Sequence, residues 1–165
     1  MRVFMYVLAT DKGFAPNPFH GWCTLACCKP AIRRRARPGD WVVAITPRRL
    51  GNRVAYAMQV EEALSFEGYW ADPRFRRKRP HWTARASLVQ KRGDNCYEPI
   101  GAGQFRQLRS MHWDHVNDRE DGEAKAKDLR GRVLVGRRFS YFGEGAIPRC
   151  PGGSPPCGFP PDSTV

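Results

Sequence analysis

The segment 37-RPGDWVVAITP-47 carries the strongest fold signal in the chain. Pro38, Gly39 and Asp40 supply turn chemistry, and the compact apolar run over residues 41–45 predicts a buried strand. Residues 52–64, NRVAYAMQVEEAL, alternate loosely between apolar and polar and predict an antiparallel partner for that strand. The centre of the fold is therefore expected to be a β-sheet.

Further elements extend outward from this pair. Residues 24–36 predict a short helix that is interrupted or restarts at Pro30, since proline is tolerated in a first helical turn. Ser65 is a plausible N-cap and predicts a helical turn over residues 65–70. Three other segments have the composition of strands: residues 2–9, 84–90 and 132–141.

These elements predict an α+β protein with one domain, residues 1–147, built on a curved, barrel-like mixed sheet with short helices. Residues 71–82 form a charged loop in this prediction, and residues 101–130 form a mobile polar insertion with weak helical signal. Residues 148–165 are rich in Pro, Gly and Ser, so we expect a disordered tail.

The charge balance points to a polyanionic partner. The chain has 28 Lys and Arg against 16 Asp and Glu, a formal net charge of +12. A surplus of this size favours nucleic acid, with a basic but functionally neutral surface as the alternative. We expect nucleic acid or a nucleotide as the partner.

The N-terminal residues and the cysteines indicate the cellular compartment. The first residues have the pattern of a strand rather than of a signal peptide, and no segment approaches the length of a membrane span. The six cysteines follow no secreted-scaffold pattern, so reduced thiols in the cytoplasm are expected.

Residues 11–29, DKGFAPNPFHGWCTLACCK, form a loop with much specific chemistry. Pro16 and Pro18 stiffen the chain around Asn17, whose amide can read both donors and acceptors of a base edge. The alternative is a turn in which Asn17 bonds only to its own backbone.

Two arginine clusters interleave with aromatic residues, a pattern that suits phosphate contact and base stacking. One lies in IRRRARPGDW and the other in YWADPRFRRKRPHW. The predicted phosphate-binding residues are Arg33, Arg34, Arg35, Arg37, Arg74, Arg76, Arg77, Lys78 and Arg79.

No cofactor or metal is predicted. His20, Cys23, Cys27 and Cys28 offer soft ligands in one segment, and His112, His115 and Asp118 offer another, but neither completes a zinc signature. Cys23 or Thr24 near Lys29, with an acid such as Glu61, is a candidate nucleophilic set. No phosphate-cradling loop or dinucleotide fingerprint occurs.

The segments GFAPNPFHGWCTLACCKPAIRRRARPGDWVV, VAYAMQVEEALSFEGYWADPRFRRKRP, GDNCYEP and FSYFGEGA resemble the nucleotide modification associated domain of the second type. That family occurs in bacteria, archaea and tailed phages and is linked by genomic context to DNA base modification. A shorter resemblance, through Gly39-Asp40-Trp41 and residues 69–73, is to EVE and PUA-like base-binding barrels. It implies a pocket that stacks and reads a flipped or modified base.

The resemblances favour a module that binds nucleic acid, DNA rather than RNA, and recognises such a base, in association with DNA-modification enzymes. Asp94 lies in a Gly-Asp-Asn turn that is otherwise a plain hairpin connection. The predicted base-binding residues are Phe14, Asn17, Phe19, Trp82, Asp94, Asn95, Tyr97 and Tyr141. Two alternatives remain: a scaffold, or an enzyme that modifies, hydrolyses or excises a modified base. The catalytic candidates for the enzyme are Asp11, Cys23, Lys29 and Asp94.

Overall fold

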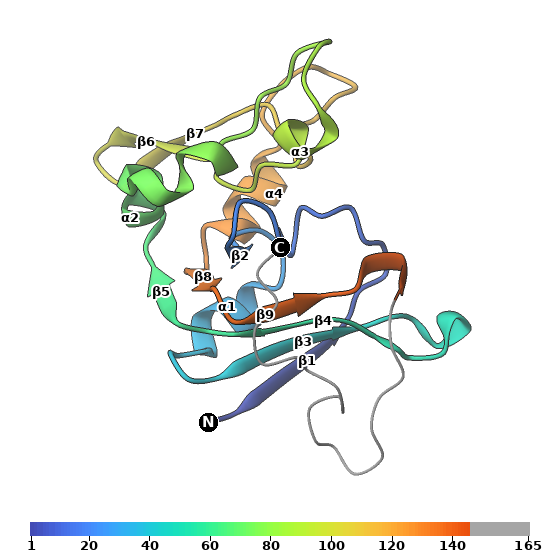
Figure 1. The fold of residues 1–165 in the computed structure, drawn as a ribbon. Coiled ribbons are helices and arrows are strands. Elements are labelled where there is room, and N and C mark those ends of the chain that lie inside the picture. Colours follow the sequence, from blue (N-terminus) through green and yellow to red (C-terminus); the bar gives the residue numbers. More distant parts are fainter. Residues whose placement is uncertain (146–165) are drawn as a thin grey trace.

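The computed structural model describes residues 1–145. They form three β-sheets with short helices at their ends and edges (Figure 1). The largest sheet contains β1 (Val3–Val7), β3 (Trp41–Ile45), β4 (Val54–Gln59) and β9 (Phe139–Tyr141), in the order β1-β3-β4-β9. The fold is therefore mixed α+β, as the sequence predicts.

The β3–β4 pair is the antiparallel pair expected from the sequence. Val42 lies opposite Met58 and Val43 opposite Ala57. β1 adds to the other edge of β3 in parallel, and β9 adds antiparallel to β4. Val42, Ala44, Tyr56 and Met58 are almost fully buried in one apolar cluster, which explains why this run specifies its register so firmly.

The second sheet has the order β2-β8-β5 and lies above the first in Figure 1. Its strands are β2 (Cys23–Leu25), β5 (Glu62–Leu64) and β8 (Val133–Gly136). β8 ends at Gly136 and β9 begins at Phe139, so one short connection joins the two sheets. A Cβ at Gly136 would lie 2.9 Å from Met58 Cγ and still closer to the backbone of Gln59, so the sheets pack tightly there.

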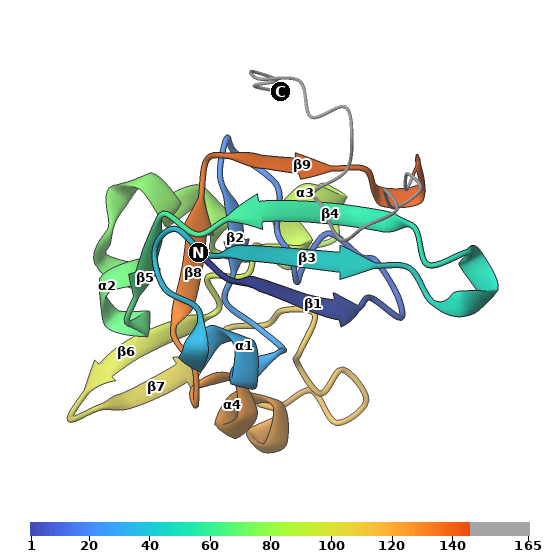
Figure 2. The same cartoon turned by 90° about the horizontal axis from the view of Figure 1, so that it is seen from below.

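The third sheet is the hairpin of β6 (Tyr97–Gly101) and β7 (Gln104–Gln107). Figure 2 shows it lying next to α2 (Phe66–Ala71) and away from the four-stranded sheet. The remaining helices are α1 (Pro30–Arg35), α3 (Leu88–Lys91), α4 (Gly122–Asp128) and the 3-10 turns η1 (Arg48–Leu50), η2 (Pro73–Lys78) and η3 (Gly143–Gly145).

Side-chain caps fix several helix starts. The Ser65 hydroxyl accepts from Gly68 N over 3.0 Å, as its predicted N-cap role requires. Ser87 and Gln90 form a reciprocal capping box at α3, and Asp121 caps α4. None of the helices within residues 1–145 is long and apolar enough to cross a membrane.

Several sequence predictions are wrong or not confirmed. Within the described residues no sheet closes into a barrel, so the PUA-like barrel is not confirmed. Residues 84–90 form a loop and the start of α3 rather than a strand, because Ser87 and Gln90 cap a helix there. Residues 132–141 divide between two sheets. Residues 101–130 contain β7 and α4, and the predicted tail, residues 148–165, lies outside the described residues.

Candidate functional site

Asn17 is buried within the opening loop rather than presented to solvent. Its side-chain Nδ2 donates to Arg92 O over 2.8 Å, and its Oδ1 accepts from Lys78 Nζ over 2.6 Å. Phe19 N also donates weakly to Oδ1, the local turn that was the alternative interpretation. With 1% of its surface exposed, Asn17 joins three segments of the chain, and a base cannot reach its amide in this conformation.

Lys78 is the buried cation of this region. Its Nζ donates to Asn17 O, Asn17 Oδ1 and Trp22 O at 2.6–3.0 Å. Burial lowers the pKa of Lys78 to about 8, although the charge of Asp94 acts in the opposite direction. The side chain is 1% exposed, so the prediction that Lys78 contacts phosphate is not supported.

Asp94 lies at the middle of the same polar cluster. Its carboxylate accepts from Thr24 Oγ1 over 2.7 Å and from Tyr69 OH over 2.8 Å. Burial raises the pKa of Asp94, while Lys78 and these hydrogen bonds oppose the rise. We call Asn17, Thr24, Tyr69, Lys78 and Asp94 the Asp94 centre.

The segment around Asp94 is not the hairpin turn that was the plain alternative. It connects α3 to β6, and Asn95 Nδ2 donates to Tyr69 O and Phe75 O. A Cβ at Gly93 would lie 2.7 Å from Pro80 N, so only glycine fits there. Asp94 and Asn95 are at most 2% exposed, and their side chains bond to other groups of the protein. In this conformation they have a structural role rather than the predicted contact with a base.

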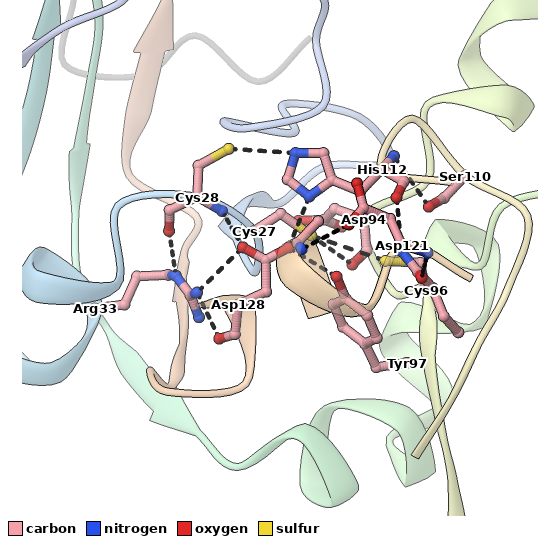
Figure 3. Close-up of polar contacts among 12 residues, drawn as sticks. Cys27, Cys28, Arg33, Asp94, Cys96, Tyr97, Ser110, His112, Asp121 and Asp128 are labelled. Atoms are coloured by element: carbon pink, nitrogen blue, oxygen red, sulfur yellow. Dashed lines mark hydrogen bonds and ion pairs between the residues drawn. The ribbon is translucent and has the colours of Figure 1, made fainter. Parts of the chain in front are cut away.

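A second buried polar cluster, the Asp128 centre, lies between β2, α1 and the end of α4 (Figure 3). Asp128 Oδ1 accepts from Cys28 N over 2.6 Å, and Oδ2 accepts from Tyr97 OH over 2.8 Å. His112 Nδ1 lies 2.7 Å from Oδ2, and His112 Nε2 lies 3.5 Å from Cys28 Sγ. The guanidinium of Arg33 donates to Asp128 O and Cys28 O, each over 2.6 Å.

Arg33 and Tyr97 therefore have roles that the sequence did not predict. Arg33 is fully buried, so it cannot bind the phosphate that was assigned to it. Tyr97 is 1% exposed and its hydroxyl points to Asp128 rather than into a base pocket. Phe14 is also buried and packs edge-on against the His112 ring at 4.9 Å.

In the Asp128 centre, His112 and Asp128 stabilise each other's charged forms. Burial alone lowers the pKa of His112, but the hydrogen bonds and charges of Asp128 and Cys28 outweigh burial and raise it to about 10. Burial raises the pKa of Asp128, and its bonds to His112, Tyr97 and Cys28 N reverse this into a net lowering. An imidazolium–carboxylate pair at neutral pH follows.

Donor atoms of Cys27, His112 and Asp128 lie within 4.8 Å of one another, which is close enough for a shared metal ion. The same Asp128 already bonds His112 Nδ1 directly, and Cys27 Sγ packs 3.8 Å from Cys96 Sγ. Structural zinc needs four ligands converging on one point. His112 and Asp128 bond to each other, and Cys27 Sγ lies against Asp94 O and Cys96 Sγ, so the three groups do not match that arrangement.

Exposed arginines gather in two places. The α1 surface consists of Arg34, Arg35, Arg37 and Arg132, all exposed, with Arg132 NH2 donating to Ala36 O over 3.0 Å. The Trp22 surface consists of the half-buried Trp22 ring and the exposed Arg74, Arg76, Arg77, Arg137 and Arg138. The guanidinium carbons of Arg74 and Arg137 lie 5.0 and 5.3 Å from the centre of the Trp22 ring.

Not every predicted phosphate ligand has a free charge. Arg74 forms a bidentate pair with Glu62 and also binds Asp72. Arg79 lies 3.8 Å above the Trp70 ring and donates to Trp70 O. Arg34, Arg35, Arg37, Arg76 and Arg77 remain exposed, as a phosphate contact requires.

The other predicted residues lie apart from one another. Trp82 stacks on His115 at 4.5 Å, and the Tyr141 hydroxyl donates to Asp11 Oδ2 over 2.6 Å. Phe19 is half-buried, whereas Cys23 is fully buried in the apolar core. Lys29 Nζ lies 4.6 Å from the Tyr6 ring centre.

Comparison with protein families matches residues 1–150 of the chain to the model described as nucleotide modification associated domain 2. The chain belongs to this family. The description of nucleotide modification associated domain 2 links the chain to a nucleotide-modification system. No curated protein and no solved structure matches it. The sequence resemblance to this domain is thereby confirmed, and the EVE and PUA resemblance is not.

Sequence reasoning missed the contribution of Cys28, His112 and Asp128 to one site of this domain. Cys28 and His112 were considered only as metal ligands, and Asp128 was not considered. His112 and Asp128 lie 84 and 100 residues after Cys28 along the chain, in a segment with weak secondary-structure signal. The adjacent Cys27-Cys28 pair was the one available signal, because two neighbouring thiols cannot both point into the same apolar core.

Proposed function

We propose that the protein binds DNA within a DNA-modification system, through the Trp22 surface and the α1 surface. The observation that supports this most directly is the partly exposed Trp22 ring with the guanidinium carbon of the exposed Arg137 lying 5.3 Å from its centre. Guanidiniums beside an aromatic face combine phosphate attraction with a platform for base stacking. Arg76 and Arg77, which share a 3-10 turn with Arg74, and Arg138, which follows Arg137 in sequence, are exposed as well.

The overall charge of +12 supports the same function, because positive charge accelerates and strengthens binding to a polyanion. Family membership favours DNA over RNA. Recognition of a modified or flipped base is assigned to partly exposed aromatics, namely Trp22 with Phe19, Trp82 and Tyr141 as further candidates. It is not assigned to Phe14, Asn17, Asp94, Asn95 or Tyr97, whose burial leaves no face for a base. DNA-modification enzymes are the expected protein partners.

The test is a titration of fluorescent duplex DNA, single-stranded DNA and RNA at several salt concentrations. The double variant R76A/R77A should bind DNA more weakly, and its salt slope should fall by about 1 for each phosphate that is no longer neutralised. The matched control, R109A/R119A, removes two arginines that are paired with Asp118 and Asp114 and should bind like the wild type. Equal affinity of R76A/R77A and the wild type would refute the proposed surface.

A further inference from the structure

Among the four cysteines of the described residues, Cys28 alone is accessible to solvent. Cys23, Cys27 and Cys96 are 0% exposed, while Cys28 is half-buried. Its sulfur lies beside an imidazole that is itself held by a carboxylate: Sγ to Nε2 is 3.5 Å and Nδ1 to Oδ2 is 2.7 Å. This order of thiol, imidazole and carboxylate is the one used by nucleophilic cysteine enzymes.

Asp128 fixes both of the other members. One of its oxygens accepts from the main-chain N–H of Cys28, and the other faces His112 Nδ1 and the Tyr97 hydroxyl. Arg33 in turn holds the main-chain oxygens of Cys28 and Asp128. The sulfur, the ring and the carboxylate are therefore positioned by bonds to neighbours on four different segments (Figure 3).

The backbone at the sulfur is strained. Cys28 has φ 59° and Lys29 has φ 43°, so two consecutive residues other than glycine adopt the left-handed conformation. Such conformations are unfavourable and persist where surrounding contacts impose them, which is common at functional sites. Here the imposed conformation turns the Cys28 side chain towards His112.

We propose that Cys28, His112 and Asp128 form a covalent catalytic site, in which they serve as nucleophile, general base and orienting carboxylate. The substrate class is an amide or ester carried on a nucleotide. The nucleotide part of this assignment rests on the proposed DNA-binding function, whereas the thiol chemistry does not. Among the cysteines of the described residues, the one placed at the imidazole is the one that is partly exposed.

The reaction proceeds in two steps. In the reactive form the proton of the Cys28 thiol lies on His112 Nε2, and the Cys28 thiolate forms a bond from Sγ to the carbonyl carbon. The bond from that carbon to the amine or alcohol breaks, and the leaving group departs with the proton from His112. In the second step His112 takes a proton from water, and the resulting oxygen attacks the thioester. The C–S bond breaks, the acid is released, and the thiolate–imidazolium pair is restored.

Asp128 contributes by fixing the ring. It accepts from Nδ1, so Nε2 faces the sulfur in the neutral tautomer, and its negative charge stabilises the imidazolium formed in each step. The groups facing His112 are Asp128, Cys28, Cys27 and the Phe14 ring. Arg33 and Tyr97 act on it only through Asp128.

The first experiment uses 4-nitrophenyl acetate on the full chain, with mass spectrometry of the protein. We expect one acetyl group on Cys28 of the wild type and none at this position in Cys28→Ser. His112→Gln should slow acetylation by at least about a hundredfold, the contribution typical of a general base. The matched control is His115→Gln, an exposed histidine of the same segment that stacks on Trp82, and it should react like the wild type.

The second experiment needs no variant. At pH 7 iodoacetamide should alkylate Cys28 faster than the thiol of an unstructured peptide, because His112 holds the Cys28 proton in the reactive form. Alkylation no faster than that of a free-cysteine peptide, together with absence of the acetyl adduct, would overturn the catalytic assignment. Stoichiometric zinc that is lost in His112→Gln would overturn it as well. Neither experiment contains nucleic acid, so failure of DNA binding is detected separately.

Discussion

Lys78 Nζ lies 2.6 Å from Asn17 Oδ1, and both side chains are about 1% exposed. The lysine also binds two main-chain oxygens of the opening loop, Asn17 O and Trp22 O. Lys78, although it belongs to a run of basic residues, thus holds residues 17–22 against η2. The opening loop is ordered by a buried cation, not by an apolar contact alone.

Replacing this lysine should be costly. Lys78→Met keeps the volume of the side chain but leaves the oxygens of Asn17 and Trp22 without their donor. We expect a loss of about 3–5 kcal/mol in the free energy of unfolding, the range for breaking a buried ionic group. Urea denaturation measures it. R76A/R77A on the same 3-10 turn should stay within about 0.5 kcal/mol of wild type, because both residues are exposed.

Gly93 should tolerate no side chain. The added methyl of Gly93→Ala would overlap the main chain of Lys78 and lie 2.8 Å from Arg79 C, so η2 or Asp94 must move. The expected destabilisation is about 2–3 kcal/mol, as for overpacked sites. Gly122→Ala is the control, since nothing lies within 4 Å of the position that its methyl group would occupy and alanine favours the helix. Equal melting temperatures for the two variants would contradict the close approach described for Gly93.

Stability should fall as the pH rises above neutrality because of His112. Its pKa is about 10 in the folded protein against 6.5 for an ordinary histidine, so the folded state keeps a proton that the unfolded state loses. This contribution is complete below pH 6.5 and declines up to about pH 10, by about 1–2 kcal/mol between pH 6.5 and 8.5. Urea unfolding of wild type and His112→Gln across this range measures it, and parallel curves would show that His112 is neutral when folded.

Trp22 should contribute to DNA binding by stacking. Trp22→Ala removes the ring that lies near Arg74 and Arg137 and should weaken binding to single-stranded DNA by about 1–3 kcal/mol, the effect of one stacked base. Trp113→Ala is the control, because that indole bonds Asp118 on a different segment. Anisotropy titrations compare the two. If Trp113→Ala weakens binding as much as Trp22→Ala, stacking at the Trp22 surface is wrong.

The sequence predicted the sheet better than the site, for physical reasons. The apolar run at residues 41–45 and its partner strand have only one way to bury their side chains, so the pairing was predictable. Arg33 was not predictable: three consecutive arginines look like surface charge. On a helix they point in different directions, and one of them, Arg33, faces inward to Asp128.

The site depends on contacts between distant segments. Asp94 was predicted as a base-binding or catalytic residue, and its position as a buried acceptor for Thr24 and Tyr69 could be found only from the meeting of β2 and α2 in the fold. Cys23 was the candidate nucleophile in sequence, and Cys28 was considered only as a metal ligand. Only the fold places Cys28 at His112 and Cys23 in the apolar core.

The short link between β8 and β9 has a consequence for how the molecule comes apart. β8 is the middle strand of one sheet and β9 an edge strand of another, and Glu61 accepts from the main-chain N–H groups of both linking residues, Arg137 and Arg138. Separation of the strands in one sheet would therefore displace a strand of the other sheet. Denaturation should accordingly be all-or-none, and a fragment cut before residue 133 would lack a strand from each of two sheets and should not fold.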